Sequence, residues 1–255
     1  MHSSFYVRNA DGGLDSTPHT ASAWGPEVQH GGPPSALLAG AVQALPEADG
    51  RVIGRITVEL LGPIPVAPLT VSAQVVRPGR SVALAEAVLS AERPVARASV
   101  WLFPDAPSGL SAEQTVPAPG PAEADPRPFP PSWQSGYADA TEWRWASGYV
   151  GIGRATAWIR PRVELVSGEP WSPIARLMTI VDSASGVSSA LDPAEWGFLN
   201  TELTVHVLRP PVGEWICLDA KTTLSSGSVG LATSHVYDEQ GLVARSAQAL
   251  LMAKR

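Results

Sequence analysis

The sequence has 255 residues, of which 44% are hydrophobic and 16% are charged, which excludes a disordered chain and predicts one large core or two joined smaller ones. The formal net charge is −6 and the Lys and Arg residues form no run, which argues against a nucleic-acid-binding surface. Cys217 is the only cysteine, so an intramolecular disulfide and a cysteine-rich metal site are excluded.

The amino-terminal segment lacks the features of a signal peptide. Its first ten residues include His2, Arg8 and Asn9 and contain no sustained apolar stretch. Elsewhere Pro, Gly or a charged residue interrupts every apolar run before it reaches the roughly 20 residues that span a bilayer. We therefore expect a cytoplasmic protein without a membrane span.

The first helix is predicted to begin at Gly31-Gly-Pro-Pro34, because proline fits the first helical turn, where its missing N–H costs nothing. Apolar residues then recur at helical spacing: Leu37, Leu38, Ala41, Val42 and Leu45. Backbone N–H groups at His30, Gly31 and Gly32 would favour a developing negative charge. The alternative interpretation is a tight turn in which His30 is hydrogen-bonded structurally.

Four strands are predicted after this helix, separated by Pro-Gly and Glu-Arg-Pro turns. They are Ile53 to Leu61, Thr70 to Val76, Val82 to Leu89 and Ala96 to Phe103. Successive short strands of this kind predict an antiparallel meander. The segment 104–131 that follows contains nine of the 25 prolines and no apolar periodicity, so we expect a linker over residues 105–131 between domains 1–104 and 132–255.

The second helix is predicted to begin at Ser172-Pro173 and to stop at Asp192-Pro193. Its apolar stripe comprises Ile174, Leu177, Met178 and Val181. Asp182 continues this stripe four residues after Met178, and a buried carboxylate is costly unless it has a function. The alternative is an Asp that caps a local turn or faces solvent.

The second half repeats the first. From Val58 to Val100 is 42 positions and from Val205 to Gln248 is 43, so the two segments superimpose with one insertion. The second meander is predicted at Leu199 to Leu208, Trp215 to Leu224, Val229 to Tyr237 and Val243 to Met252, with a hairpin turn at 238–241. Gln248 occupies the position that corresponds to Val100 in the first half, which indicates that only one of the two copies is catalytic. Taken by itself, Gln248 is equally well interpreted as a polar residue that points outward from a sheet edge.

One apolar helix followed by four antiparallel strands, and preceded by a further strand, predicts an α+β protein of the hotdog fold. The duplication predicts a double hotdog, with two antiparallel sheets, each wrapped around one central helix and joined into a continuous sheet. The interface between the halves is then the natural cleft.

The sequence lacks the signatures of nucleophilic serine catalysis, of phosphate-binding loops and of metal sites. No Gly-x-Ser-x-Gly elbow occurs, and Ser183 and its neighbouring serines have no adjacent His. Neither phosphate-binding Gly-rich signature follows a strand. His2, His19 and His235 show no ligand spacing, so no metal site is expected, and His206 is assigned to packing.

Three segments together resemble the thioesterase-like double-hotdog family related to bacterial acyl-CoA thioesterase II. They are Gln29-His-Gly-Gly-Pro-Pro-Ser-Ala-Leu-Leu38, Leu203-Thr-Val-His-Val-Leu-Arg-Pro-Pro211 with Glu214-Trp215, and Gly241-Leu-Val-Ala-Arg-Ser-Ala-Gln248. In that family an Asp on the second central helix, a Thr or Ser at the start of the next strand, and a Gln on the last strand hold the attacking water.

The resemblance implies roles for individual residues. Asp182 matches the acid, Gln248 matches the amide, and the hydroxyl position falls on Asn200, with Thr201 beside it. The implied reaction is hydrolysis of an acyl thioester by water that Asp182 activates. His30, Gly31 and Gly32 would bind the oxyanion, and coenzyme A would be part of the substrate, with no other cofactor.

Two rival functions remain open at this point. A double-hotdog dehydratase or isomerase would place His30 and Asp182 on either side of the acyl chain. A non-catalytic acyl-binding module is the second rival, because Asn200 cannot reproduce a hydroxyl. Exposed sheet edges also make a homo-oligomer possible.

Overall fold

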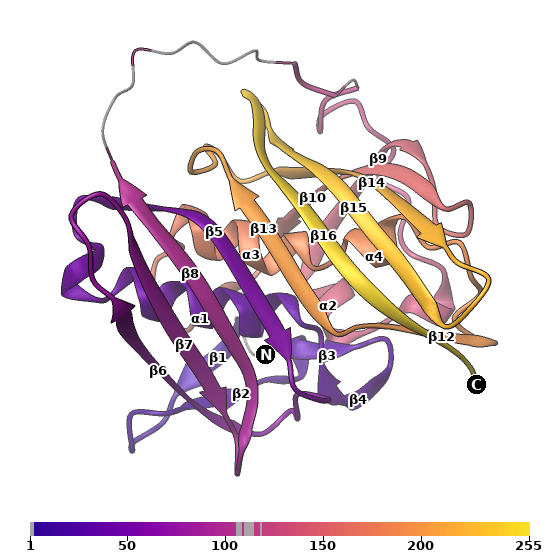
Figure 1. Ribbon diagram of the computed structural model, residues 1–255. Coiled ribbons are helices and arrows are strands. Elements are labelled where there is room, and N and C mark those ends of the chain that lie inside the picture. Colours follow the sequence, from indigo (N-terminus) through magenta and orange to yellow (C-terminus); the bar gives the residue numbers. More distant parts are fainter. Residues whose placement is uncertain (1–2, 106–108, 110–114, 118) are drawn as a thin grey trace.

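Two antiparallel meanders meet edge to edge in the computed structural model, which describes residues 3–105, 109, 115–117 and 119–255 (Figure 1). The first has the order β6-β7-β8-β5 and the second the order β13-β16-β15-β14. Their strands are β5 (Arg51–Leu60), β6 (Pro68–Arg77), β7 (Ala83–Ser90), β8 (Pro94–Pro104), β13 (Glu202–Val207), β14 (Ile216–Leu224), β15 (Val229–Asp238) and β16 (Gly241–Lys254). Antiparallel pairing of β5 with β13, with Val58 opposite Leu203, makes one continuous sheet.

The strands bury one face because their apolar residues alternate. In β7 the buried residues Ala83, Ala85, Ala87 and Leu89 alternate with more exposed ones. Since successive side chains of a strand point to opposite faces, this pattern gives the sheet one apolar face that must be covered. Seven of the eight predicted meander strands match the observed ones to within two residues at either end.

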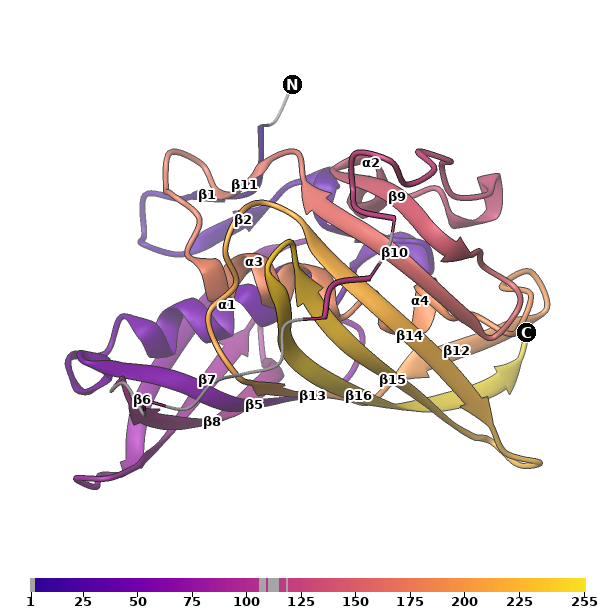
Figure 2. The same cartoon turned by 90° about the horizontal axis from the view of Figure 1, so that it is seen from above.

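Two helices cover that apolar face. Figure 2 shows α1 (Gly32–Gln43) and α3 (Pro173–Val181) between the large sheet and short strands on the opposite side. The predicted start of the second helix is confirmed, because Ser172 Oγ accepts a hydrogen bond from the Ala175 N–H at 3.0 Å. A Cβ at Gly32 would lie 2.0 Å from the Thr179 carbonyl oxygen, so glycine is required where the helices cross.

The second helix is shorter than predicted. It ends at Val181, Asp182 is its C-cap, and only the single turn α4 (Ala184–Val187) follows. The Asp182 carbonyl accepts a hydrogen bond from the Gln248 side chain at 3.0 Å, in place of the helical partner four residues later. A tertiary contact therefore ends the helix eleven residues before Asp192.

The predicted strand from Leu199 to Leu208 is divided into β12 (Trp196–Asn200) and β13. Both segments pair with β16, but the register shifts by one residue between Asn200 opposite Leu250 and Thr204 opposite Ala247. The Glu202 side chain accepts the Ala249 N–H at 2.9 Å within this irregularity. The shift is a β-bulge, a feature that re-aims side chains.

More strands precede the helices than the one per half that was predicted. The sheet continues through β2 (Leu14–Ser16), β1 (Ser4–Arg8) and β11 (Glu164–Val166) at one end and through β10 (Arg154–Pro161) and β9 (Thr141–Gly148) at the other. The first strand of the chain, β1, pairs in parallel with β11, which comes from the second half of the chain. A separate pair, β3 (Ala21–Ser22) with β4 (Gly25–Gln29), leads into α1.

The predicted linker falls partly outside the described residues, at 106–108, 110–114 and 118. Its later part packs on the second half: the indole N–H of Trp158 donates to the Pro119 carbonyl at 3.0 Å, and Phe129 is buried. The short helix α2 (Gly136–Asp139) follows. Within the described part of the chain, no helix combines the length and apolar character needed to cross a membrane.

Candidate active site

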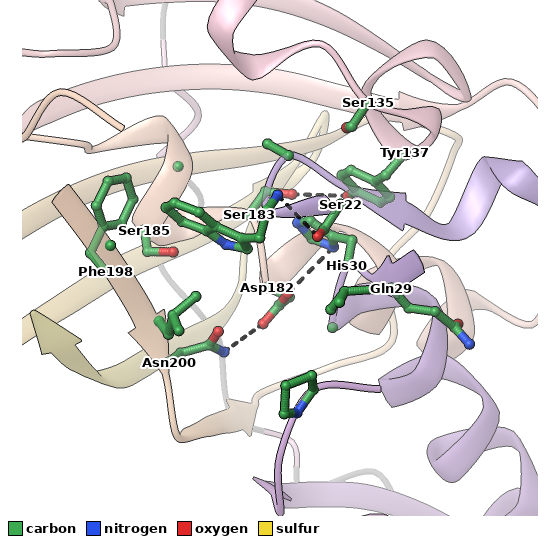
Figure 3. A pocket seen from close by; sticks show the side chains of 18 of the residues that line it. Ser22, Gln29, His30, Ser135, Tyr137, Asp182, Ser183, Ser185, Phe198 and Asn200 are labelled. Atoms are coloured by element: carbon green, nitrogen blue, oxygen red, sulfur yellow. Dashed lines mark hydrogen bonds and ion pairs between the residues drawn. The ribbon is translucent and has the colours of Figure 1, made fainter. Parts of the chain in front are cut away.

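A cavity of about 590 Å³ opens between the two halves of the chain (Figure 3). The first half contributes residues from 22–31 and 60–64 to its wall, and the second half contributes residues from 182–186, 197–201 and 251–255. The rest of the wall comes from the segment 129–143, which joins the halves. The volume lies within the range typical of small-molecule sites.

Asp182 is the buried acid of this cavity. Its residue surface is 6% exposed, and it lines the wall at the end of α3. Carboxylate oxygen Oδ1 accepts hydrogen bonds from Asn200 Nδ2 at 2.8 Å and from Gln248 Nε2 at 3.0 Å. The two amides therefore fix Oδ1 and leave Oδ2 to face the first half of the chain.

The start of α1 lies directly against this carboxylate. A Cβ at Gly31, the N-cap of α1, would be 2.8 Å from Asp182 Oδ2. The amino-terminal end of a helix carries partial positive charge, which stabilises an anion placed there. The crossing of α1 and α3 thus brings the acid from the end of one helix to the favourable end of the other.

His30 is the second titratable residue at this point. Its Nδ1 lies 3.3 Å from Asp182 Oδ2, and its ring stacks on Tyr137 with centroids 3.6 Å apart and planes within 2° (Figure 3). The same Nδ1 accepts the Gly32 N–H at 3.1 Å, so a neutral His30 carries its proton on Nε2. Burial lowers the pKa of His30, while the Asp182 charge opposes that shift.

The predicted oxyanion donors differ in availability. The Gly32 N–H is occupied by His30, so it is not free to bind an oxyanion. The Gly31 N–H lies at the cavity wall without a hydrogen-bond acceptor among the residues that the structure describes. Since residues 33 and 34 are prolines, Gly31 is the backbone donor that this helix start can offer to a ligand.

Gln248 lies behind the acid, not in the cavity wall. It is fully buried, its Nε2 donates to both Oδ1 and the carbonyl oxygen of Asp182, and its Oε1 accepts the Ser185 N–H at 3.1 Å. All of these partners are protein groups. The structure therefore brings Gln248 to Asp182 as predicted, and gives it the geometry of a residue that positions the carboxylate and the following turn.

The other predicted neighbour, Thr201, lines the cavity but is exposed. Its backbone N–H donates to the Ala249 carbonyl at 3.0 Å and its carbonyl accepts the Leu60 N–H at 3.0 Å. These bonds join β16 and β5 at the bulge. Asn200, not Thr201, contacts Asp182.

Tyr137 was missed by sequence reasoning. Its hydroxyl donates to the Thr179 carbonyl at 2.9 Å, and Ser183 Oγ lies 2.9 Å away and can donate to it in turn. Burial raises the pKa of the Tyr137 phenol, so it stays protonated and holds the His30 ring from one side. The residue lies just after the proline-rich segment, where the sequence has no periodicity to signal it.

Aromatic side chains form much of the remaining wall. They are Trp24, Phe129, Trp133, Tyr137, Trp143 and Phe198. Phe198 and Trp24 meet edge to face with centroids 5.0 Å apart, and Phe129 and Trp143 do so at 4.5 Å. No pattern in the sequence predicts that these rings lie together, because they come from separate loops and strands.

A sheet wrapped around central helices, with a buried carboxylate facing a cavity between two halves, defines the chain as a hotdog-fold enzyme. Protein-family comparisons are more specific. The family model described as acyl-CoA thioesterase N-terminal domain matches residues 20–103, and the acyl-CoA thioesterase C-terminal domain matches residues 121–252. The chain belongs to the acyl-CoA thioesterase family, and its enzyme class is thioesterase.

Solved structures agree on the fold. A hotdog-fold protein of unknown function from Alicyclobacillus acidocaldarius has a TM-score of 0.76 at 20% identity, with 94% of this chain and 92% of that chain covered. A protein from Thermobifida fusca, provisionally described as thioesterase II, has a TM-score of 0.75 at 19% identity, with coverages of 98% and 96%. The acyl-CoA thioesterase II TesB2 of Mycobacterium marinum has a TM-score of 0.65 at 15% identity, with 86% of each chain covered. Among curated proteins, no sequence matches this chain.

Proposed function

We propose that this chain is a double-hotdog thioesterase that hydrolyses acyl thioesters, with coenzyme A as part of the substrate and Asp182 as general base. The observation that carries the proposal is the asymmetric Asp182 carboxylate. Two amides hold Oδ1, while Oδ2 faces the cavity beside Gly31. A base fixed in this way is oriented before substrate arrives.

The hydrolysis step uses Oδ2. A water molecule attacks the thioester carbonyl carbon while Oδ2 accepts one of its protons, so a carbon–oxygen bond forms and the carbonyl oxygen becomes an oxyanion. The free Gly31 N–H at the positive end of α1 is the group that stabilises this charge. Collapse of the intermediate breaks the carbon–sulfur bond, and the proton held by Asp182 passes to the departing thiolate.

Asn200 supports hydrolysis even though it replaces a hydroxyl residue. Its Nδ2 donates to Asp182 Oδ1 at 2.8 Å, which is the shorter of the two amide contacts on that oxygen. The contact keeps the carboxylate in place, as a hydroxyl donor would. This observation favours an active hydrolase over the acyl-binding module that the Asn200 replacement had left open.

A second candidate is a dehydratase or isomerase acting on an acyl thioester. It is favoured by one observation, the approach of His30 Nδ1 to Asp182 Oδ2 at 3.3 Å from opposite halves of the chain. A His and an Asp beside a bound acyl chain could remove and deliver protons, although at 3.3 Å these two side chains lie side by side and not across the chain as predicted. Against it, Nδ1 already accepts the Gly32 N–H, so a neutral His30 cannot donate from that atom.

Product analysis distinguishes the candidates. Purified protein is incubated with acyl-CoA and 3-hydroxyacyl-CoA substrates, free thiol is followed with a chromogenic disulfide, and the acyl products are identified by mass spectrometry. Hydrolysis gives free coenzyme A and a carboxylic acid in equal amounts. An enoyl thioester without thiol release would establish dehydration, and binding without any product would establish the binding module.

A further inference from the structure

Three aromatic rings of the cavity wall form a contiguous cluster. Trp24 lies 5.0 Å from Phe198, Phe198 lies 5.6 Å from Trp133, and Trp133 lies 6.5 Å from Trp24, measured between ring centroids. All three side chains line the cavity. They come from the β3–β4 turn, strand β12 and the segment after the proline-rich region, so tertiary structure alone assembles them.

The aromatic cluster lies next to Asp182 and its hydrogen-bond partner Asn200 in the cavity wall. Phe198 and Asn200 are two residues apart on β12, so their side chains point to the same face about 7 Å apart along the strand. On the other side, Trp133 packs over Gly186, where an added Cβ would lie 3.4 Å from Trp133 Cζ3. Gly186 follows Asp182 by four residues. An acyl group whose carbonyl is held at Asp182 therefore extends toward these rings.

Neighbouring side chains of the same cavity wall hold the rings in place. The Arg255 guanidinium lies over the Trp24 ring at 5.4 Å from its centroid, and Phe129 stacks near Trp133 at 5.7 Å. Trp24 and Trp133 remain half-buried, so part of each ring surface is open to a ligand. Rings held in this way present flat faces and edges at fixed angles, which suit another ring better than a flexible chain because aromatic pairs add edge-to-face and offset-stacked attraction to area burial.

We infer that this thioesterase takes ring-bearing acyl groups, such as arylalkanoyl thioesters, in preference to straight-chain acyl groups of the same carbon number. The inference rests on the proposed function for its catalytic readout, but ring binding can be measured without turnover. The carbonyl lies at Asp182, and the ring lies among Trp24, Trp133 and Phe198.

The test compares 3-phenylpropanoyl-CoA with nonanoyl-CoA, which have the same number of acyl carbons. The wild type is expected to favour the phenyl substrate by at least about fivefold in kcat/KM, since one aromatic pair supplies that much. Trp133→Leu and Phe198→Leu are expected to lower kcat/KM for the phenyl substrate more than for nonanoyl-CoA, and so to remove the preference. Trp101→Leu, a control on β8 away from the cavity wall, is expected to keep it.

Calorimetric binding of both thioesters to Asp182→Asn separates this inference from the proposed function. If the wild type releases no thiol but Asp182→Asn binds the phenyl thioester at least about fivefold more tightly, the ring site stands and the hydrolase proposal fails. Equal affinities and equal kcat/KM values for the two thioesters overturn the ring site. A preference that both Trp133→Leu and Phe198→Leu retain overturns it as well.

Discussion

Replacing Gly31 with Ala tests the contact between the start of α1 and the acid. The backbone at Gly31 is right-handed helical, with φ −68° and ψ −14°, so alanine fits the conformation without strain. The added Cβ would lie 2.8 Å from Asp182 Oδ2, 3.1 Å from its Cγ and 3.2 Å from its Oδ1. The whole carboxylate therefore faces the new methyl group.

The magnitude follows from the hydrogen bonds on that carboxylate. Restoring an ordinary contact of 3.4 Å requires Oδ2 to move by about 0.6 Å. Oδ1 cannot follow without lengthening its bonds to Asn200 at 2.8 Å and Gln248 at 3.0 Å. Because a displacement near 1 Å costs about a hundredfold in rate, we expect kcat to fall about 10- to 100-fold, or about 1.4 to 2.7 kcal/mol in the activation barrier.

Gly40→Ala is the matched control for this substitution. Gly40 lies in the same helix, and a Cβ there would meet nothing within 4 Å. Alanine in a helix interior is expected to raise the free energy of unfolding by up to about 1 kcal/mol and to leave kcat unchanged. Thiol release from one acyl-CoA is measured for both variants alongside thermal unfolding. Wild-type kcat in Gly31→Ala would refute the reasoning, because the carboxylate would then tolerate displacement.

Three further predictions concern the residues around the acid. Gln248→Leu leaves the Asp182 carbonyl and the Ser185 N–H without their partner, so denaturant unfolding should show a loss of about 2 kcal/mol or more, and an unchanged midpoint would contradict the burial argument. Asn200→Thr keeps a hydrogen-bond donor for Asp182, whereas Asn200→Val has the shape of threonine without the donor. We expect kcat to be at least about tenfold lower in the valine variant than in the threonine variant, and equal rates would show that this bond is dispensable. Burial lowers the pKa of His30 below its ordinary 6.5, so the unfolded chain binds the His30 proton more tightly than the folded chain does. The contribution of neutral His30 to the free energy of unfolding is therefore complete above pH 6.5. It is lost as the pH falls from 6.5 through the lower pKa of the folded state. His30→Gln should flatten this part of the stability curve, and identical curves for both proteins would assign it to another group.

The fold followed closely from local signals in the sequence. Short segments separated by turn residues such as Pro-Gly and Glu-Arg-Pro predicted the meander strands, and Ser172-Pro173 predicted the start of α3, because both signals depend on residues that are near neighbours in the chain. The end of α3 could not be predicted in the same way. Gln248, 66 residues further along, binds the Asp182 carbonyl and ends the helix, and no local pattern carries that information.

The site, like the fold, was predicted only in part. The resemblance placed Asp182, Gln248 and Asn200 in one group, and the structure brings them into contact. The sequence does not tell in which direction each side chain points. The resemblance implied that Gln248 holds the attacking water, whereas in the structure Gln248 lies behind Asp182 and binds its carboxylate. Tyr137 and Trp133 were missed because they lie in segments without apolar periodicity, where position depends on packing alone.

Asp182→Asn tests the central claim most directly. An Asn side chain has the same shape, and its oxygen can still accept from Asn200 and Gln248. Its neutral NH₂ replaces the charged Oδ2 that lies 3.3 Å from His30 Nδ1, so no buried charge has to be stabilised. The variant is therefore expected to unfold at the same temperature as the wild type or higher. Since an amide cannot accept the proton of the attacking water, thiol release from acyl-CoA should fall by about 100-fold or more. A folded Asp182→Asn protein that releases thiol at the wild-type rate would contradict the account.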